Sequence, residues 1–325
     1  MADRFLELSK QDKKDILNAV SGDLGMLPDV AEKDVWVCFA LEALFSIPNR
    51  RPMAFKGGTS LSKVYGLIKR FSEDIDVSVN FLDDYPGQIS KTRANTYREE
   101  IENNLQQYKS KVIIPALEAA ASRFDLSIEP GDTDWEVHVN YKSVLESNKD
   151  YIKTRVKIEL SGRNETEPSS KHLIKPYLAS ELSDLEFPTA KVDTLAAERT
   201  FWEKITLIHA VINAGEIADS AHRMSRHWSD LTLIMKSEIG EKALKDKDLC
   251  NRVVNHKDKF WRDGAARYDD CRNKLFKLVP QGNALKTLKT DYDAMLGSGM
   301  FLNDNPPPFS TIMADIKTLE TLLNS

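Results

Sequence analysis

Alternation of apolar and polar residues identifies the strands predicted for the first part of the chain. Residues 74–79 read Asp-Ile-Asp-Val-Ser-Val, so their three polar side chains share one strand face and the three apolar ones share the other. Residues 156–160, Val-Lys-Ile-Glu-Leu, alternate in the same way. Three further strands are predicted, the last two as a hairpin around Pro130-Gly131-Asp132: residues 52–56, 126–129 and 135–140.

Apolar residues at a helical period dominate the rest of the chain. The first ~50 residues read as helical and end at Pro48, and residues 93–124 form a long helical stretch with a break at Pro115. After Gly57-Gly58, Thr59 or Ser60 can cap a helix that runs through Ile68. A proline-containing loop over 168–188 leads to Val192, from which helix follows helix to Pro280, and a final helix starts at about Ser310.

This order of elements predicts an α+β fold. Strands and helices mix in the first part of the chain, whereas the later part is helical throughout. We therefore expect an N-terminal domain over residues 1–190, with a small mixed sheet flanked by helices, and an all-helical C-terminal domain over residues 191–325.

Composition places the chain among ordinary globular proteins. The 325 residues are 41% hydrophobic and 29% charged, with a formal net charge of −5. Three scattered cysteines exclude a disulfide framework and predict a reducing cytoplasm. No apolar run is long enough to cross a bilayer, so we expect no membrane partner.

The total charge conceals an uneven distribution. Residues 199–289 hold 18 basic and 12 acidic side chains, a net charge of +6, while residues 1–198 carry −7 and residues 290–325 carry −4. A basic helical part suits a phosphate backbone and an acidic strand part suits a metal ion. Chance clustering on solvated helix faces explains the split equally well.

Chemistry is indicated first by Asp74 and Asp76, which share a strand face and can hold a hard divalent cation. A two-metal site needs a third carboxylate on a neighbouring strand, and Glu159 is the best candidate. The preceding turn, Lys56-Gly57-Gly58-Thr59-Ser60, offers backbone N–H groups and hydroxyls as a triphosphate cradle. Taken singly, the turn is more often a simple helix cap and the carboxylate pair more often a solvated face.

A second group of candidates lies in the basic part. Lys204 falls in a largely apolar run, so its ammonium must pair, reach solvent or face a cleft. Further on, Arg226 and Asp230 lie near a helix start. A lysine aimed at phosphate and an aspartate that orients it or receives a proton would suit nucleotidyl transfer. A structural salt-bridge cluster is the alternative. Trp228 and Trp261 could stack on RNA bases or could belong to the core.

Together these residues resemble the AbiEii/AbiGii-type nucleotidyltransferase toxins, a branch of the polymerase-beta-like nucleotidyltransferase superfamily. The likeness rests on five segments in this order: Glu32-Lys33-Asp34-x-Trp36, residues 55–63, residues 70–76, residues 197–204 and Arg226-His227-x-x-Asp230-Leu231. The resemblance implies a nucleotidyltransferase fold for the N-terminal domain. It also implies that Gly58 to Ser60 hold the nucleotide, that Asp74 and Asp76 bind metal, and that Lys204 and Asp230 are essential. One departure is the segment 61–73, which is longer than the usual gap and predicts an extended loop.

The resemblance further implies a bacterial toxin that transfers NMP from an NTP to RNA with Mg²⁺, or alternatively Mn²⁺. In related toxins the acceptor is the tRNA 3′ end, a cognate antitoxin restrains the enzyme, and the pair acts in abortive infection against phage. Two alternatives stay open. The acceptor could be a small molecule or a protein, or the chain could be an inactive binding module of the same fold.

Overall fold

A computed structural model describes residues 3–82, 91–145, 153–215, 217, 223–261, 264–297, 301 and 305–325. The chain divides into two compact units. The first comprises residues 1–64 and 71–195, and the second comprises residues 65–70 and 196–325. The predicted domain boundary after residue 190 remains our proposal; the compact units divide after Leu195, at the end of a strand.

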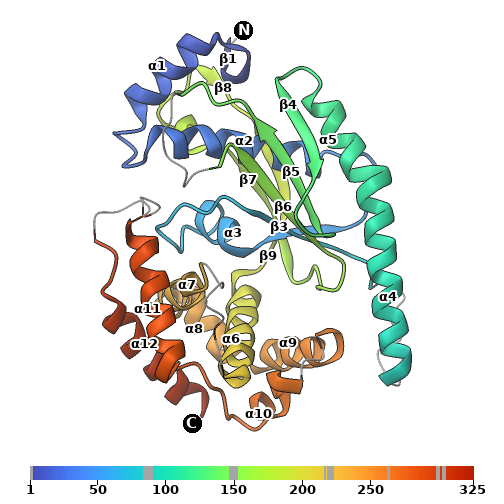
Figure 1. The fold of residues 1–325 in the computed structure, drawn as a ribbon, viewed down its shortest axis with the longest axis vertical. Helices are drawn as coiled ribbons and strands as arrows, with labels where there is room; N and C mark the ends of the chain where they lie inside the picture. The colour runs from blue at the N-terminus through green and yellow to red at the C-terminus, as the bar shows by residue number, and fades with distance from the viewer. Residues whose placement is uncertain are drawn as a thin grey trace. The chain divides into compact units, whose positions relative to one another are not determined.

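The first unit contains a mixed sheet and the helices that cover it (Figure 1). Its helices are α1 (Lys10–Val20), α2 (Pro28–Phe45), α3 (Gly57–Lys63), α4 (Lys91–Tyr108) and α5 (Ile114–Ala121). Its strands are β1 (Asp3–Arg4), β2 (Met53–Lys56), β3 (Ile75–Val79), β4 (Leu126–Pro130), β5 (Glu136–Tyr141), β6 (Arg155–Ser161), β7 (Ser169–Ile174), β8 (Leu185–Glu186) and β9 (Ala190–Leu195).

Strand order in the main sheet is β4-β5-β6-β3-β2-β9-β7 among the described residues, and β1 pairs separately with β8. β3 runs parallel to β6 and antiparallel to β2, while β2 runs parallel to β9. The predicted hairpin is confirmed as β4 and β5, which pair antiparallel. The mixed sheet of the predicted α+β fold is therefore present.

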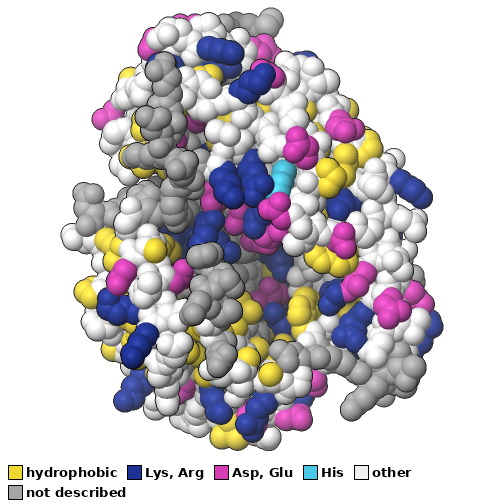
Figure 2. Space-filling model, viewed as in Figure 1, with side chains coloured by type: hydrophobic (Ala, Val, Ile, Leu, Met, Phe, Trp, Pro, Cys, Tyr) yellow, Lys and Arg dark blue, Asp and Glu magenta, His cyan; other side chains and the backbone are white. Residues whose placement is uncertain are grey.

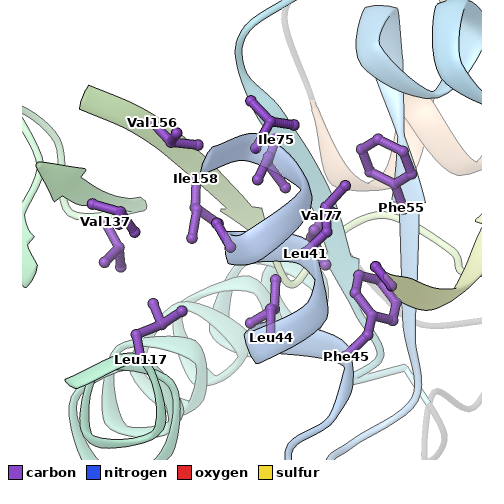
Figure 3. Packing of buried hydrophobic residues seen from close by; sticks show 14 of the residues in the cluster. Leu41, Leu44, Phe45, Phe55, Ile75, Val77, Leu117, Val137, Val156 and Ile158 are labelled. Carbon is purple, nitrogen blue, oxygen red and sulfur yellow. The ribbon is translucent and has the colours of Figure 1, made fainter. Parts of the chain in front are cut away.

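One face of the sheet packs on α2 and α5 to form the main core (Figure 3). Ile75 and Val77 of β3, Ile158 of β6 and Val137 of β5 are fully buried on this face. They are the apolar members of the alternations that predicted these strands, because successive strand residues point to opposite faces. Helix α2 is buried on nearly all sides, which is typical of a central helix.

The predicted break near Pro115 is confirmed. Helix α4 passes into a π-helical turn at Lys109–Ile113 before α5 begins, and Pro115 occupies the first turn of α5. Proline lacks the N–H that an uninterrupted helix would use at this point, so the regular ladder ends before it.

Some predicted boundaries are wrong. Residues 168–188 include strand β7, and Val192 lies in strand β9 rather than at the start of the helical region. Helix α3 begins at Gly57, so neither Thr59 nor Ser60 caps it, and it ends at Lys63 instead of Ile68. Gly66 adopts a left-handed φ of 60°, which a continuing right-handed helix cannot contain.

The second unit is helical in its described residues, apart from an isolated bridge between Arg70 and Phe301. Its helices are α6 (Ala197–Ala214), α7 (Ser225–Met235), α8 (Glu238–Lys245), α9 (Lys247–Phe260), α10 (Tyr268–Arg272), α11 (Gly282–Gly297) and α12 (Phe309–Leu323). Trp228 is fully buried and its indole N–H donates to the Leu278 carbonyl, so it belongs to the core rather than to a stacking surface. No described helix is long and apolar enough to cross a membrane.

Candidate functional site

The candidate metal carboxylates lie on the sheet face opposite the core. Asp76 on β3 is in register with Glu159 on β6 on one side and with Lys56 on β2 on the other. Asp74 is 8% exposed and immediately precedes β3, whereas the predicted strand began at Asp74 itself. Because paired residues at the same register project from the same face, Asp76 and Glu159 are neighbours. The sequence therefore identified a third carboxylate that the sheet places beside the predicted pair.

Lys157 pairs with this acidic group and was not among the site residues predicted from the sequence. Its ammonium forms an ion pair with Glu159 and lies 3.8 Å from Asp74 Oδ2. Burial alone would lower the pKa of Lys157, but the carboxylates of Asp74 and Glu159 outweigh it and raise the pKa. The signal was present in the sequence, because Lys157 shares the strand face of Glu159.

The chemistry of these three carboxylates suits a hard divalent cation, which would have to displace the Lys157 ammonium from Glu159. Among the described residues, the three ligand atoms that lie within 4.8 Å of one another belong instead to Asp132, Glu136 and His138. Asp74, Asp76 and Glu159 offer only carboxylate oxygens, which Mg²⁺ and Mn²⁺ prefer over nitrogen or sulfur. The protein also leaves room for the Asp76 carboxylate. A Cβ added to Gly57 would lie 2.0 Å from Asp76 Oδ2, so only glycine fits beside it.

Thr59 and Ser60 in the predicted nucleotide-holding turn are fully buried. The Thr59 hydroxyl donates to the Asp74 carbonyl at 2.5 Å, and the Ser60 hydroxyl donates to the Gly57 carbonyl at 3.0 Å. Both hydroxyls thus tie the turn to itself and to the strand that carries Asp76. Lys56, Gly57 and Gly58 are partly exposed. The part of all five residues in nucleotide binding stays a prediction.

A further acidic group lies on the neighbouring strand. Ligand atoms of Asp132, Glu136 and His138 lie within 4.8 Å of one another, and Glu136 is in register with Glu159. Arg155 already pairs with Asp132 Oδ2 and faces His138 Nδ1, both at 3.2 Å. Acidic and basic side chains accordingly gather over β5 and β6 in Figure 2. These pairings favour an arginine-centred cluster beside the main carboxylates.

The second unit holds the other predicted residues in a buried charged cluster. Lys204 on α6 donates to Asp230 Oδ2 on α7 at 3.0 Å, and Asp230 is fully buried. Arg70 donates to both Asp230 oxygens, at 2.8 and 2.7 Å. The Lys204 ammonium therefore forms an ion pair, which was one of the three alternatives predicted for it. The nearby Arg199 and Glu203 form an ion pair at 3.1 Å.

Arg70 was not selected as a site residue from the sequence. It is 3% exposed, and its two parallel hydrogen bonds to Asp230 have the bidentate geometry of a strong charge-assisted pair. Its position in the segment 70–76 of the family resemblance was the available signal. Pairing over 160 residues of chain gives no local pattern that sequence reasoning could use.

Electrostatics in this cluster keep Asp230 ionised. Burial opposes the charge, but the Arg70 guanidinium and the Lys204 ammonium outweigh it and hold the pKa of Asp230 well below its usual range. Burial lowers the pKa of Lys204, although Asp230 partly offsets this. The pKa of His227 falls well below 6.5 because of burial and the neighbouring cations of Lys204 and Arg226. Asp230 is thus an ionised anchor for two cations, not a group that accepts a proton near neutral pH.

Each unit therefore brings together part of the predicted site. The first unit groups the carboxylates with the turn at residues 56–60. The second unit groups Lys204 with Asp230, and Arg226 is close enough to depress the pKa of Lys204. Their catalytic and binding roles remain proposals.

Comparison with known proteins identifies the class. The family described as "Nucleotidyl transferase AbiEii toxin, Type IV TA system" matches residues 40–315. This chain therefore belongs to the AbiEii nucleotidyltransferase toxin family, and it is a nucleotidyltransferase. The family resemblance and the nucleotidyltransferase fold expected from the sequence are both confirmed.

One solved structure is similar over nearly the whole chain. It is MenT4, a nucleotidyltransferase toxin from Mycobacterium tuberculosis H37Rv, which superposes with a TM-score of 0.51 at 16% identity. The alignment covers 98% of this chain and 90% of MenT4, and at this identity it establishes the shared fold alone. No curated protein sequence matches the chain.

Replacing Gly57 by alanine tests the close approach at Asp76. Gly57 has a φ of 79°, so alanine strains the backbone, and its Cβ collides with the carboxylate. We expect Gly57→Ala to lose about 1–3 kcal/mol of unfolding free energy from the strained backbone and to weaken Mn²⁺ binding. Urea unfolding and Mn²⁺ titration followed by electron paramagnetic resonance measure the two effects.

Gly66→Ala is the matched control. Gly66 also has a positive φ, of 60°, but nothing lies within 4 Å of an added Cβ. It should share the backbone penalty and keep the Mn²⁺ affinity. Equal Mn²⁺ affinities in the two variants would contradict the steric role of Gly57.

Asp230→Asn tests the buried cluster. The substitution leaves Arg70 and Lys204 buried without their carboxylate, so we expect a loss of about 3–5 kcal/mol of unfolding free energy at pH 7. Because the pKa of Asp230 is depressed in the folded protein, its stabilisation is present above the unfolded value of 3.8 and is lost as pH falls toward the folded value. Urea unfolding from pH 7 to pH 2 should show the difference shrinking in acid.

Asp315→Asn provides the comparison in the same unit. Asp315 pairs with Lys236 at a site where the lysine side chain is 54% exposed, and exposed pairs contribute about 0–1 kcal/mol. A difference between wild type and Asp230→Asn that is constant across pH would rule out the depressed pKa.

Proposed function

We propose that this enzyme transfers NMP from an NTP to an RNA acceptor, the 3′ end of tRNA, as the toxin of an abortive-infection system. The observation that carries the proposal is the carboxylate group of Asp74, Asp76 and Glu159 on one sheet face in a chain of the AbiEii family. In the reaction, an RNA hydroxyl forms a bond to the α-phosphorus of the NTP and pyrophosphate leaves.

Asp74, Asp76 and Glu159 would hold Mg²⁺, or Mn²⁺ in its place. Bound there, the ion would neutralise phosphate charge and lower the pKa of the attacking hydroxyl. The chain's own contribution is to fix the carboxylates: Gly57 leaves space for Asp76, and the Thr59 hydroxyl holds the backbone of Asp74. Such preorganisation supports catalysis because the ligands need not rearrange when substrate binds.

Lys56 to Ser60 are proposed to hold the NTP phosphates. Lys56 and the two glycines are the accessible members, while Thr59 and Ser60 support the turn from within. An ammonium group and close backbone N–H groups are both suited to an anion.

In the second unit, Lys204 and Arg226 are proposed to neutralise negative charge on the substrates. Lys204 is 7% exposed and held by Asp230, which therefore acts as a positioning residue through its bonds to Lys204 and Arg70. A fixed ammonium stabilises developing charge better than one that must first order itself.

The basic character of residues 199–289 supports an RNA acceptor. Trp261 is partly exposed, unlike the buried Trp228, and is proposed as a stacking surface beside the Lys257 ammonium that lies over its ring. The type IV toxin–antitoxin description of the family implies a cognate antitoxin. A cytoplasmic location stays a prediction from the cysteine content.

Incubation with labelled NTPs, Mg²⁺ and total tRNA tests the proposal. Wild type should label RNA. Asp76→Asn should reduce labelling by about 100-fold or more, because loss of a ligand should cost at least as much as the roughly 10–100-fold that loss of a group orienting a ligand costs. Asp193→Asn is the matched control, because Asp193 lies on β9 and pairs with Arg50 away from the carboxylate group. It should label RNA as wild type does.

The fraction that carries the label decides between acceptors. Label in RNA that weakens steeply with salt supports a polyanionic substrate. Label in protein or small molecules alone would replace RNA with those acceptors. No labelling of any fraction by wild type, with any of the four NTPs, would favour an inactive binding module.

A further inference from the structure

Three consecutive charged residues of α2 are buried. Glu32, Lys33 and Asp34 are 4%, 3% and 1% exposed, in a helix whose other buried side chains are apolar. Successive residues of an α-helix point about 100° apart, so the three side chains leave the helix in three directions. They belong to the segments that carry the family resemblance, and the proposed reaction assigns them no role.

Lys33 and Asp34 each hold a different part of the first unit. The Lys33 ammonium donates to Glu73 Oε2 at 2.5 Å and to the Lys153 carbonyl at 3.0 Å. Asp34 Oδ1 accepts from the Lys63 ammonium at 2.5 Å, and its Oδ2 accepts from the Tyr177 N–H at 2.7 Å. Both ion pairs are shielded from water, since the side chains of Lys33 and Lys63 are only 3% and 2% exposed.

The two partners stand at the ends of one segment. Lys63 is the last residue of α3, and Glu73 directly precedes Asp74. Between them, residues 65–70 belong to the second compact unit. Asp34 thus holds the chain where it leaves the first unit, and the adjacent Lys33 holds it where it returns.

Both ion pairs help to fix the backbone of Asp74. Lys33 holds the residue before it, while Asp34 holds α3 through Lys63, and α3 holds the Asp74 carbonyl through the Thr59 hydroxyl. Stability alone does not explain such pairs, because a buried ion pair is commonly no more stabilising than apolar residues of the same volume. The two pairs are explained if they fix the position of the chain segment between Lys63 and Glu73.

We propose that Lys33 and Asp34 are positioning residues that hold Asp74 in place for cation binding by clamping the two ends of the segment 64–72. This inference rests on the proposed function, since it assigns the cation to Asp74, Asp76 and Glu159. Removal of the Lys33–Glu73 pair weakens cation binding while the fold persists, because the charges are replaced together and neither is left buried alone.

Mn²⁺ titration followed by electron paramagnetic resonance tests the clamp without requiring activity. The test variant is Lys33→Met/Glu73→Gln, which removes both charges and leaves the net charge unchanged. We expect Mn²⁺ affinity to fall about 10-fold or more, the usual effect of removing a group that orients a metal ligand. Arg50→Met/Asp193→Asn is the control with the same change of charge, because it removes a more exposed ion pair of the same unit. Its affinity should stay within about twofold of wild type.

Thermal unfolding of the same samples separates positioning from stability. Weaker Mn²⁺ binding by a variant that melts like wild type supports the clamp, whereas unchanged affinity overturns it. Asp34→Asn serves if the double variant fails to fold, since the amide oxygen can still accept from Tyr177 N–H while the charge facing Lys63 is lost. It should also weaken Mn²⁺ binding, and unchanged affinity would overturn the proposal.

Wild-type controls distinguish this inference from the proposed function. Mn²⁺ binding by wild type that Asp76→Asn abolishes places the cation at the proposed carboxylates, and the clamp variants then decide the inference alone. Absence of such binding overturns the inference. If wild type labels RNA but shows no such Mn²⁺ binding, the proposed enzyme activity stands and only the assigned cation site is rejected.

Discussion

The pleat of the β-strand, which turns successive side chains to opposite faces, is the constraint on which the first unit depends. Along β5, β6 and β3, one set of side chains packs on α2 and α5 and the other set is polar or charged. Register then aligns the charged sets from strand to strand, so Asp76 and Glu159 become neighbours. A slip of one residue in any of these strands would put carboxylates into the core and destroy the site together with the fold.

Several buried charges follow the same rule in both units: each of them lies against an opposite charge. Lys33 and Lys63 meet carboxylates in the first unit, and Asp230 meets two cations in the second. Ionised groups in a poorly solvated interior tolerate few alternative arrangements, because a displaced partner leaves an uncompensated charge. Such pairs restrict geometry more than apolar contacts do, which suits residues that must hold a ligand set or an ammonium in one place.

Sequence patterns predicted what depends on local periodicity. The strands around Asp76 and Glu159, the hairpin and the break at Pro115 follow from side-chain alternation and from proline chemistry. Strand β9 was missed because six residues directly before a long helix offer little to distinguish them from its start. The pair of Lys157 with Glu159, two residues apart on one strand, was visible in the sequence. The ion pairs of Arg70, and of Lys33 and Asp34 in α2, join segments distant in the chain, so no local pattern contains them. The internal hydrogen bonds of Thr59 and Ser60 were likewise invisible until the turn had a three-dimensional setting.

The membership of residues 65–70 in the second unit sets an order on folding during synthesis. Arg70 leaves the ribosome long before its partner Asp230, which follows 160 residues later, so its guanidinium must stay hydrated until α7 has been made. Closing so long a loop is entropically costly, and contacts of this separation form late. The cluster around Lys204 is therefore assembled only when most of the chain exists. An incomplete chain, released before α7, lacks Asp230 and therefore the ion pairs that hold Lys204 and Arg70.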